Sequence, residues 1–246
     1  MAGSMNATVS PGTLVIAHRG ASAGAPDNSL EAFEKAIEVG SDLIEFDVRR
    51  TRDGELIAFH DESVGAHSVG RLTREKIHLQ TGIKPPLLNE VLDLAKGHVG
   101  LDLELKEDGY TDRVIKALCD RFEPDELVIT SFIDAVVAEV KRVSPSIKSG
   151  LLVGIGRPEH LFRTRLAELF PVRRARACGA DRIAMHYRLA DLGALSRAHE
   201  AGFPSYIWTV NDDDLLRRYL VDPRVRAVIT DVPGRALELR HELLVG

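Results

Sequence analysis

The sequence contains little cysteine and no long apolar run, and both absences restrict what this protein can be. Only two cysteines, Cys119 and Cys178, occur among 246 residues, without CxxC spacing. We interpret both as reduced, buried small hydrophobic residues rather than as a disulfide framework or a zinc site. No apolar stretch approaches the ~20 residues that a membrane-spanning helix needs, and the opening MAGSMNATVSPG lacks the regions of a signal peptide. We therefore expect a cytoplasmic protein without a membrane span.

An excess of basic charge is also missing. The formal net charge is −5 and the sequence pI is about 6.0. Proteins that bind nucleic acids or anionic membranes usually carry a basic surface. We therefore expect no nucleic-acid partner, although a local cationic pocket is compatible with this charge. The sequence leaves the oligomeric state open.

No Pro/Gly/Ser-rich linker and no block of like charges divides the chain. With 44% hydrophobic and 28% charged residues, a chain of this length can bury a large core. We expect one domain over residues 12–246, with a short insertion near residues 62–86, and a tail over residues 1–11. The letters MAGSM, which precede a second methionine, look like a remnant of an expression tag.

Short β-rich apolar runs alternate with longer segments in which apolar residues recur at helical spacing. The predicted strands cover Leu14–Ala17, Leu43–Val48, Leu56–Phe59, Val99–Leu105, Leu127–Thr130, Lys148–Val153, Arg182–Met185, Ser205–Thr209 and Ala227–Thr230. The predicted helices cover Leu30–Val39, Leu88–Ala95, Thr111–Arg121, Ala135–Arg142, His160–Leu169, Leu189–Ala201, Asp212–Tyr219 and Gly234–Leu244. If the third strand forms a hairpin with the second across the turn TRDG, eight βα units remain. This number predicts an α/β fold of the (β/α)8 TIM barrel type, with an open doubly wound sheet as the alternative.

A barrel places its chemistry at the C-terminal ends of its strands, and acidic residues occur there. In LIEFDVRR, Glu45 and Asp47 alternate with apolar residues, so both carboxylates lie on one face of the strand. The segment GLDLELKED repeats this pattern with Asp102, Glu104 and Lys106. Carboxylates inside a barrel are strongly destabilising unless a cation or a proton neutralises them.

Glu45, Asp47 and Glu104 should therefore converge near one end of the barrel, with Lys106 one step nearer the rim. Three oxygen donors without a soft ligand suit Mg²⁺ or Ca²⁺. The alternative is a buried salt-bridge network without a catalytic role, but buried ion pairs are weak evidence for stability. We predict a divalent metal site made by these three carboxylates.

Two histidines stand at the ends of predicted strands, His18 after VIA and His60 after LIAF. Imidazoles titrate near neutral pH. A pair of them beside a carboxylate-bound metal can supply the general base and the general acid for hydrolysis. A single histidine at a strand end is more often structural, and we interpret the other histidines in that way.

Taken in order, these motifs resemble the glycerophosphodiester phosphodiesterase family, whose fold is a TIM barrel, over nearly the whole domain. The matching motifs are His18-Arg19-Gly20, Pro26-Asp27-Asn28-Ser29, Glu45 with Asp47, Asp53-Gly54, His60-Asp61, Glu104-Leu105-Lys106, Trp208 to Asn211 and Thr230 to Pro233. The resemblance implies metal-dependent hydrolysis of glycerophosphodiesters to glycerol 3-phosphate and an alcohol. It leaves open which histidine is the acid, and whether water attacks directly or the glycerol hydroxyl first forms a cyclic phosphate.

The sequence departs from the family pattern in two places. Asp27 stands where the family usually has the longer Glu, while Asn28 with Glu31 still resembles a helix N-cap box. Residues 62–86 replace the usual Arg-Thr-Thr-Gly pattern after His-Asp. Since this segment usually shapes substrate access, the head-group specificity stays open.

Three further residues are candidates for substrate binding. Arg19 leaves the first strand beside His18, and its planar fork of donors suits a phosphate. Lys106 adds a second positive charge against the anionic diester. Trp208 offers an apolar face to the glycerol carbons, with core or lid packing as the alternative. We expect Asn211 to cap the helix DDDLLRRYL rather than to touch substrate.

Two other functions compete with this one. A non-catalytic barrel that binds phosphodiesters or phospholipids would leave both histidines and a complete ligand set without a use. A lysophospholipase D-like enzyme acting on lipid diesters would need an apolar groove or an interfacial helix near the barrel mouth. The low apolar content of residues 62–86 favours a water-soluble diester.

Overall fold

Parallel strands close into a barrel in the computed structural model, which describes residues 12–154 and 170–245. The ring is closed because β1 pairs with both β2 and β11. In ring order its eight strands are β1 (Leu14–His18), β2 (Leu43–Arg50), β6 (Gly100–Leu105), β7 (Leu127–Ser131), β8 (Lys148–Val153), β9 (Arg182–His186), β10 (Ser205–Trp208) and β11 (Val225–Thr230). The TIM barrel prediction is confirmed, and the open doubly wound sheet is wrong.

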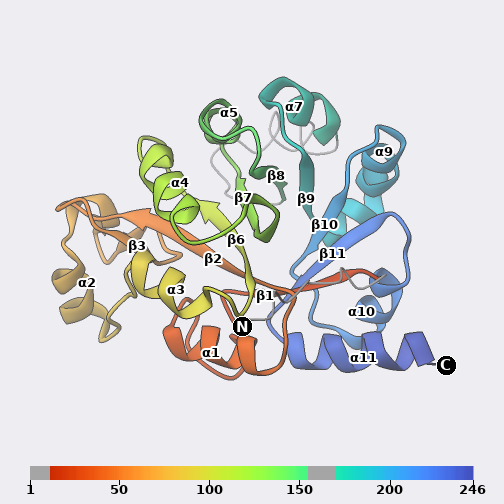
Figure 1. The fold of residues 1–246 in the computed structure, drawn as a ribbon, viewed down its shortest axis with the longest axis horizontal. Coiled ribbons are helices and arrows are strands. Elements are labelled where there is room, and N and C mark those ends of the chain that lie inside the picture. The colour runs from red at the N-terminus through yellow and green to blue at the C-terminus, as the bar shows by residue number, and fades with distance from the viewer. Residues whose placement is uncertain (1–11, 155–169, 246) are drawn as a thin grey trace, which may run out of the picture.

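Helices surround the strands (Figure 1). They are α1 (Leu30–Glu38), α3 (Leu88–Ala95), α4 (Thr111–Cys119), α5 (Asp134–Val143), α7 (Pro171–Cys178), α8 (Tyr187–Leu189), α9 (Leu195–Glu200), α10 (Asp213–Leu220) and α11 (Pro233–Val245), with a 3₁₀ turn η2 (Pro124–Glu126) before β7. The predicted helix His160–Leu169 lies outside the described residues. The predicted helix Leu189–Ala201 is interrupted by a π-helical segment η4 (Ala190–Ala194), because Gly193 has a φ of 89°.

The segment that follows β2 contains more structure than the sequence predicted. β3 (Leu56–Ala58) pairs antiparallel with β2, which confirms the predicted hairpin. It is followed by β4 (Ser63–Val64), β5 (His67–Ser68), the 3₁₀ turn η1 (Val69–Arg71) and α2 (Arg74–Thr81). Val64, Val69, Leu72 and Ile77 pack with Ile57 into a small apolar cluster. These residues show no regular spacing in the sequence, so only their packing reveals them as a core.

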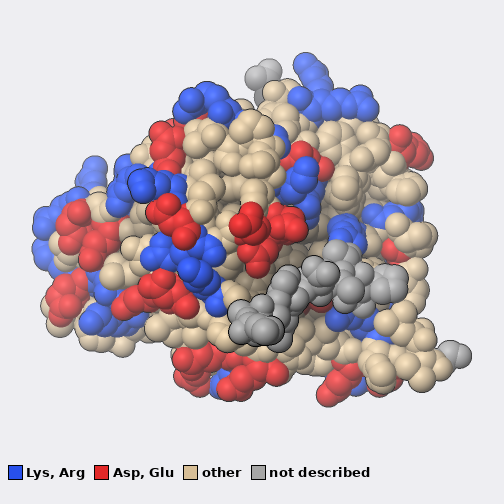
Figure 2. Space-filling model, viewed as in Figure 1, with Lys and Arg blue, Asp and Glu red and all other residues tan. Residues whose placement is uncertain are grey.

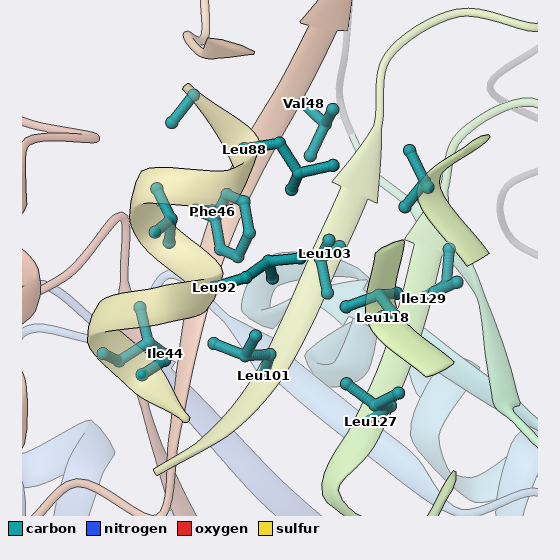
Figure 3. Packing of buried hydrophobic residues seen from close by; sticks show 14 of the residues in the cluster. Ile44, Phe46, Val48, Leu88, Leu92, Leu101, Leu103, Leu118, Leu127 and Ile129 are labelled. Atoms are coloured by element: carbon teal, nitrogen blue, oxygen red, sulfur yellow. The ribbon is translucent and has the colours of Figure 1, made fainter. Parts of the chain in front are cut away.

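Most apolar packing lies between the outer face of the barrel and the helices. Leu88 and Leu92 of α3 lie against Phe46 of β2 and Leu103 of β6 (Figure 3). Each such side chain, once fully buried, contributes roughly 1.5–3 kcal/mol. Because successive strand residues face opposite sides, this outward packing turns the alternate residues of β2 and β6 into the barrel.

The inside of the barrel is divided into an apolar layer and a polar one. Ile16, Leu152, Ala184, Tyr206 and Ile229 form the apolar layer, together with Val128 and Ala227. The polar layer begins two residues later along the same strands, at His18, His186 and Trp208. Polar groups therefore gather at the C-terminal mouth of the barrel, although Asp102 lies deeper, level with Val128 of the apolar layer.

The two cysteines differ in their exposure to solvent. Both cysteines are free, but only Cys178 is buried, so the prediction is wrong for Cys119. Leu118 occupies the inward face of α4, and the next residue, Cys119, is rotated by about 100° away from it.

Among residues 12–154 and 170–245, no helix has the length and apolar character needed to cross a membrane. Acidic and basic side chains are interspersed on the face shown in Figure 2.

Candidate active site

The three predicted carboxylates meet inside the mouth of the barrel. β2 and β6 are adjacent and in register, with Asp47 opposite Glu104. One ligand oxygen from each of Glu45, Asp47 and Glu104 lies within 4.8 Å of the others. All three residues are buried, with exposed fractions of 5%, 1% and 8%. The strand register therefore brings together the set that the alternating sequence pattern predicted.

Two cations lie against this cluster. Lys106 Nζ is 2.7 Å from Asp47 Oδ1 and 2.6 Å from Glu104 Oε1, and Arg19 Nε is 3.2 Å from Asp47 Oδ2. Burial opposes the ionisation of Asp47, but Lys106 and Arg19 outweigh it and hold the pKa of this carboxyl well below its usual range. Burial also opposes the charge on Lys106, yet Asp47 and Glu104 raise its pKa. Asp47 and Lys106 therefore form a charged pair.

The other acidic groups are less well neutralised. Burial, followed by the charges of Asp47 and Glu104, raises the pKa of Glu45 well above its ordinary value. Burial also raises the pKa of Glu104 to about 7, although Lys106 opposes this shift. Asp102 lies next to Glu45 in the strand register and accepts a hydrogen bond from Thr130 Oγ1 at 3.1 Å. Burial raises its pKa to about 7.

A divalent cation fits this donor set. The three ligands offer only carboxylate oxygens, which suit Mg²⁺ or Ca²⁺. Asp47 Oδ1 has no aligned hydrogen-bond donor, although Lys106 Nζ lies close to it. Arg19 and Lys106 supply two positive charges against three carboxylates and Asp102. An additional cation would remove the electrostatic penalty that raises the pKa of Glu45 and Glu104.

The turn between β1 and α1 holds Asp47 from the other side. Asn28 has a φ of 56° and is 4% exposed. Its Nδ2 donates to Asp47 Oδ2 at 2.8 Å, and its Oδ1 accepts from the backbone N–H of Asp47 at 3.1 Å. The predicted N-cap role of Asn28 is therefore wrong. Ser29 caps α1 instead, because its Oγ accepts from the backbone N–H of Ala32.

Arg19 also occupies a left-handed backbone conformation, with a φ of 55°. This conformation, which is uncommon for a residue other than glycine, directs its backbone N–H to Glu45 Oε2 at 3.0 Å. Its Nη1 donates to Asp27 Oδ2, also at 3.0 Å. Arg19 thus contacts both carboxylates of β2, and the shorter Asp27 still reaches the guanidinium.

His18 is held by a chain of polar groups from the last two βα loops. Its Nδ1 lies 2.6 Å from Asp231 Oδ1, and Asp231 Oδ2 accepts from Asn211 Nδ2 at 2.5 Å. Burial opposes the ionisation of Asp231, but His18 and Asn211 lower its pKa. Asn211 does not cap α10, contrary to our prediction. Asp212 does so by accepting from two backbone N–H groups of the first turn.

Asp231 is a site residue that the sequence analysis did not assign. It belongs to the Thr230 to Pro233 motif, which was the available signal. Sequence reasoning gave no partner for this carboxylate because His18 lies 213 residues away along the chain. Closure of the barrel between β11 and β1 brings the two together.

His60 lies two residues after the end of β3, the second strand of the hairpin that begins with β2. Its Nδ1 lies 2.9 Å from Asp61 Oδ1, and its backbone oxygen accepts from Arg49 Nε at 2.9 Å. Burial lowers the pKa of His60, and Lys106 adds to this effect while Asp47 opposes it.

A groove of about 760 Å³ opens above the cluster and is lined by His60, Arg19, Lys106 and Glu104. Its apolar side contains Trp208, Phe132 and Ile133. A smaller cavity of about 30 Å³ contacts His18, Glu45 and Trp208. A separate cavity of about 680 Å³, lined by residues such as Thr13, Phe203 and Arg240, contains none of the predicted site residues.

Trp208 lines both the groove and the smaller cavity, and its neighbours hold it in place. Its ring makes edge contacts with Phe132 and His186, with centroid distances of 5.7 and 5.1 Å. Gly154 leaves the necessary space, since a Cβ there would lie 2.5 Å from the indole ring. Trp208 thus lines the groove and also packs against other aromatic rings, while its contact with substrate stays a prediction.

The chain is similar in sequence and in fold to known phosphodiesterases. Residues 18–235 match the Glycerophosphoryl diester phosphodiesterase family. The chain is 31% identical over 251 residues to the glycerophosphodiester phosphodiesterase of Caldanaerobacter subterraneus subsp. tengcongensis, covering 92% of this chain and 97% of that protein. The crystal structure of glycerophosphodiester phosphodiesterase from Thermotoga maritima is similar with a TM-score of 0.75 and 26% identity, covering 93% of this chain and 98% of that one. An Oleispira antarctica phosphodiesterase, solved in complex with the product sn-glycerol-3-phosphate, has a TM-score of 0.74 and 23% identity, covering 92% and 96%.

Proposed function

The chain belongs to the glycerophosphoryl diester phosphodiesterase family, and on that basis we propose that it hydrolyses glycerophosphodiesters to glycerol 3-phosphate and an alcohol. The observation that carries the proposal is the buried cluster of Glu45, Asp47 and Glu104, with Arg19 and Lys106 against it, at a groove lined by His60. The product seen in the Oleispira antarctica phosphodiesterase is consistent with this reaction.

Glu45, Asp47 and Glu104 would hold a divalent metal ion, Mg²⁺ or Ca²⁺. When bound, the ion supplies positive charge for a non-bridging phosphate oxygen as negative charge develops there. The protein contributes the preformed position of the ligands, since Asn28 and the backbone N–H of Arg19 each orient one carboxylate of β2. Such outer contacts fix the ligands in the geometry that binding requires.

His18 and His60 divide the general acid and general base roles. The Nδ1 of each ring is engaged by a carboxylate, from Asp231 and Asp61 respectively. Nε2 is therefore the nitrogen that exchanges a proton with the substrate, the attacking hydroxyl or the leaving alcohol. Asp231 also fixes the orientation of the His18 ring, as a carboxylate does for a catalytic histidine in other hydrolases.

Arg19 and Lys106 contact the phosphate from two sides in this proposal, and Trp208 packs against the glycerol carbons. We expect Lys106→Met to lower kcat/KM for anionic diesters by about 10- to 100-fold at saturating metal, the scale of a lost charge-assisted hydrogen bond. The same change should tighten Mg²⁺ or Ca²⁺ binding, because it removes a positive charge beside Asp47 and Glu104.

Steady-state kinetics and calorimetric metal titration measure these two effects separately. Lys116→Met, at an exposed ion pair on α4, is the matched control and should change neither. If metal-saturated Lys106→Met keeps the wild-type kcat/KM, Lys106 is only a counter-ion for the carboxylates. In that case Arg19 and the metal would bind the phosphate without a contribution from Lys106.

The proposed activity is tested by measuring glycerol 3-phosphate release from glycerophosphocholine, with and without a chelator. We expect release that the chelator stops and added Mg²⁺ or Ca²⁺ restores. Binding of the diester without any release would favour the non-catalytic barrel.

One observation favours a second candidate, a lysophospholipase D-like activity on lipid diesters. Phe132 and Ile133 are each 37% exposed and line the groove, so its apolar wall comes from the loop after β7 rather than from residues 62–86. Lysophosphatidylcholine serves as the competing substrate in the same assay. A higher kcat/KM for this lipid than for glycerophosphocholine would support the second candidate.

A further inference from the structure

Arg49 is a buried charged residue that the proposed reaction does not use. It is 5% exposed and lies two residues after Asp47 on the same face of β2. Its Nε donates to the backbone oxygen of His60 at 2.9 Å, and its Nη1 is paired with Glu107 Oε1. A single side chain therefore joins β2, the loop after β3 and the end of β6.

Within residues 12–154 and 170–245, few other hydrogen bonds hold the chain at His60. β3 ends at Ala58, and the backbone N–H of Phe59 donates to the backbone oxygen of Asp47 at 3.0 Å, one residue before the histidine. Asp61, which pairs with the His60 ring, has a side chain that is 69% exposed. An exposed carboxylate holds a ring only weakly in water. The buried guanidinium is thus the firmer restraint on His60.

The other end of the contact is anchored. Glu107 follows Lys106, and its backbone N–H donates to Tyr110 Oη at 3.3 Å. Tyr110 is 2% exposed and donates its hydroxyl to the backbone oxygen of Val48 at 2.6 Å. Glu107 is therefore tied to the strand that carries Arg49, and the planar guanidinium is held between two fixed acceptors.

We propose that Arg49 is a positioning residue for His60, which it holds through the backbone of the histidine, with Glu107 keeping the guanidinium in place. The inference rests on the proposed function, in which His60 transfers a proton. A displacement of a reacting group by about 1 Å costs on the order of 100-fold in rate. Loss of the restraint should therefore lower kcat and leave substrate binding nearly unchanged.

The test is a double-mutant cycle with Arg49→Met and His60→Ala. We expect Arg49→Met alone to reduce kcat by about 10- to 100-fold, with KM changed by less than about 3-fold. In the His60→Ala background, Arg49→Met should lower kcat by less than about 2-fold, because the imidazole that Arg49 positions is absent. Arg52→Met, at an exposed residue of the adjoining turn, is the matched control. The proposal would be overturned if the kcat reductions of the two single variants multiply in the double variant, or if Arg49→Met changes only KM.

A second readout does not depend on activity. In proton NMR spectra, the imidazole signal of His60 is identified by its loss in His60→Ala. We expect Arg49→Met to shift or broaden this signal and to leave that of His18 in place, whereas Arg52→Met changes neither. An unchanged His60 signal in Arg49→Met contradicts the inference. Absence of hydrolysis by the wild type would instead contradict the proposed function, and the NMR comparison would still stand.

Glu107→Gln covers the case in which Arg49→Met does not fold. It keeps the side-chain shape and removes only the charge that holds the guanidinium. We expect a smaller fall in kcat that again disappears in the His60→Ala background. Unchanged kcat in Glu107→Gln would in that case overturn the proposal.

Discussion

Replacing Glu104 with alanine should reduce hydrolysis of glycerophosphodiesters to background while the barrel stays folded. Glu104 supplies one of the three clustered oxygens, so its loss leaves an incomplete ligand set for the metal. The fold should tolerate the change, because burial raises the pKa of this group to about 7 and its charged form is therefore unfavourable in the protein. The measurements are turnover at saturating Mg²⁺ or Ca²⁺, calorimetric metal titration and thermal unfolding.

The same loss of activity is expected for Glu45→Ala and Asp47→Ala, but their stabilities should differ. Asp47 neutralises Lys106 and Arg19, and removing one partner of a buried ion pair costs roughly 3–5 kcal/mol. Asp47→Ala should therefore unfold at a clearly lower temperature than the other two variants.

Glu75→Ala, at an exposed residue of α2, is the control for this series and should retain activity and metal affinity. Near-normal activity of Glu104→Ala in the presence of a chelator would eliminate the metal hypothesis.

His18→Ala and His60→Ala should each lower kcat by on the order of 10² to 10⁴, the usual contribution of a positioned acid or base. If chemistry limits the rate, the wild type should show a bell-shaped pH profile that loses one limb in each variant. Since burial lowers the pKa of His60, the limb lost in His60→Ala should lie below the ordinary histidine value of about 6.5. An unchanged rate and profile in both variants would remove these residues from the mechanism.

Two further variants make this result specific. Asp231→Asn should lower kcat by a large part of the factor expected for His18→Ala. The substitution removes the charge beside Nδ1 of His18 and preserves the shape of the side chain. His98→Ala, at an exposed residue, should leave kcat unchanged. Full activity of Asp231→Asn would mean that His18 works without its carboxylate partner.

The sequence by itself predicted the barrel and the residues at its mouth. The alternation in LIEFDVRR and GLDLELKED assigns Glu45, Asp47 and Glu104 to one strand face, because the period of two is a local property of extended backbone. A closed parallel barrel gathers the C-terminal ends of its strands at one rim, and this rule alone places His18 and Arg19 there. His60 lies there because β3 runs back along β2 as a hairpin.

Only the tertiary structure decided how these groups are held. Asn28 and Asn211 were both assigned to helix caps, a role that suits asparagine and that the sequence alone favours. In the folded chain each is instead bound to an aspartate of the site, Asp47 or Asp231. The following residue, Ser29 or Asp212, then caps the helix. Local propensity cannot distinguish two adjacent capping residues, whereas the folded barrel places a carboxylate of the site, Asp47 or Asp231, within hydrogen-bond distance of the asparagine.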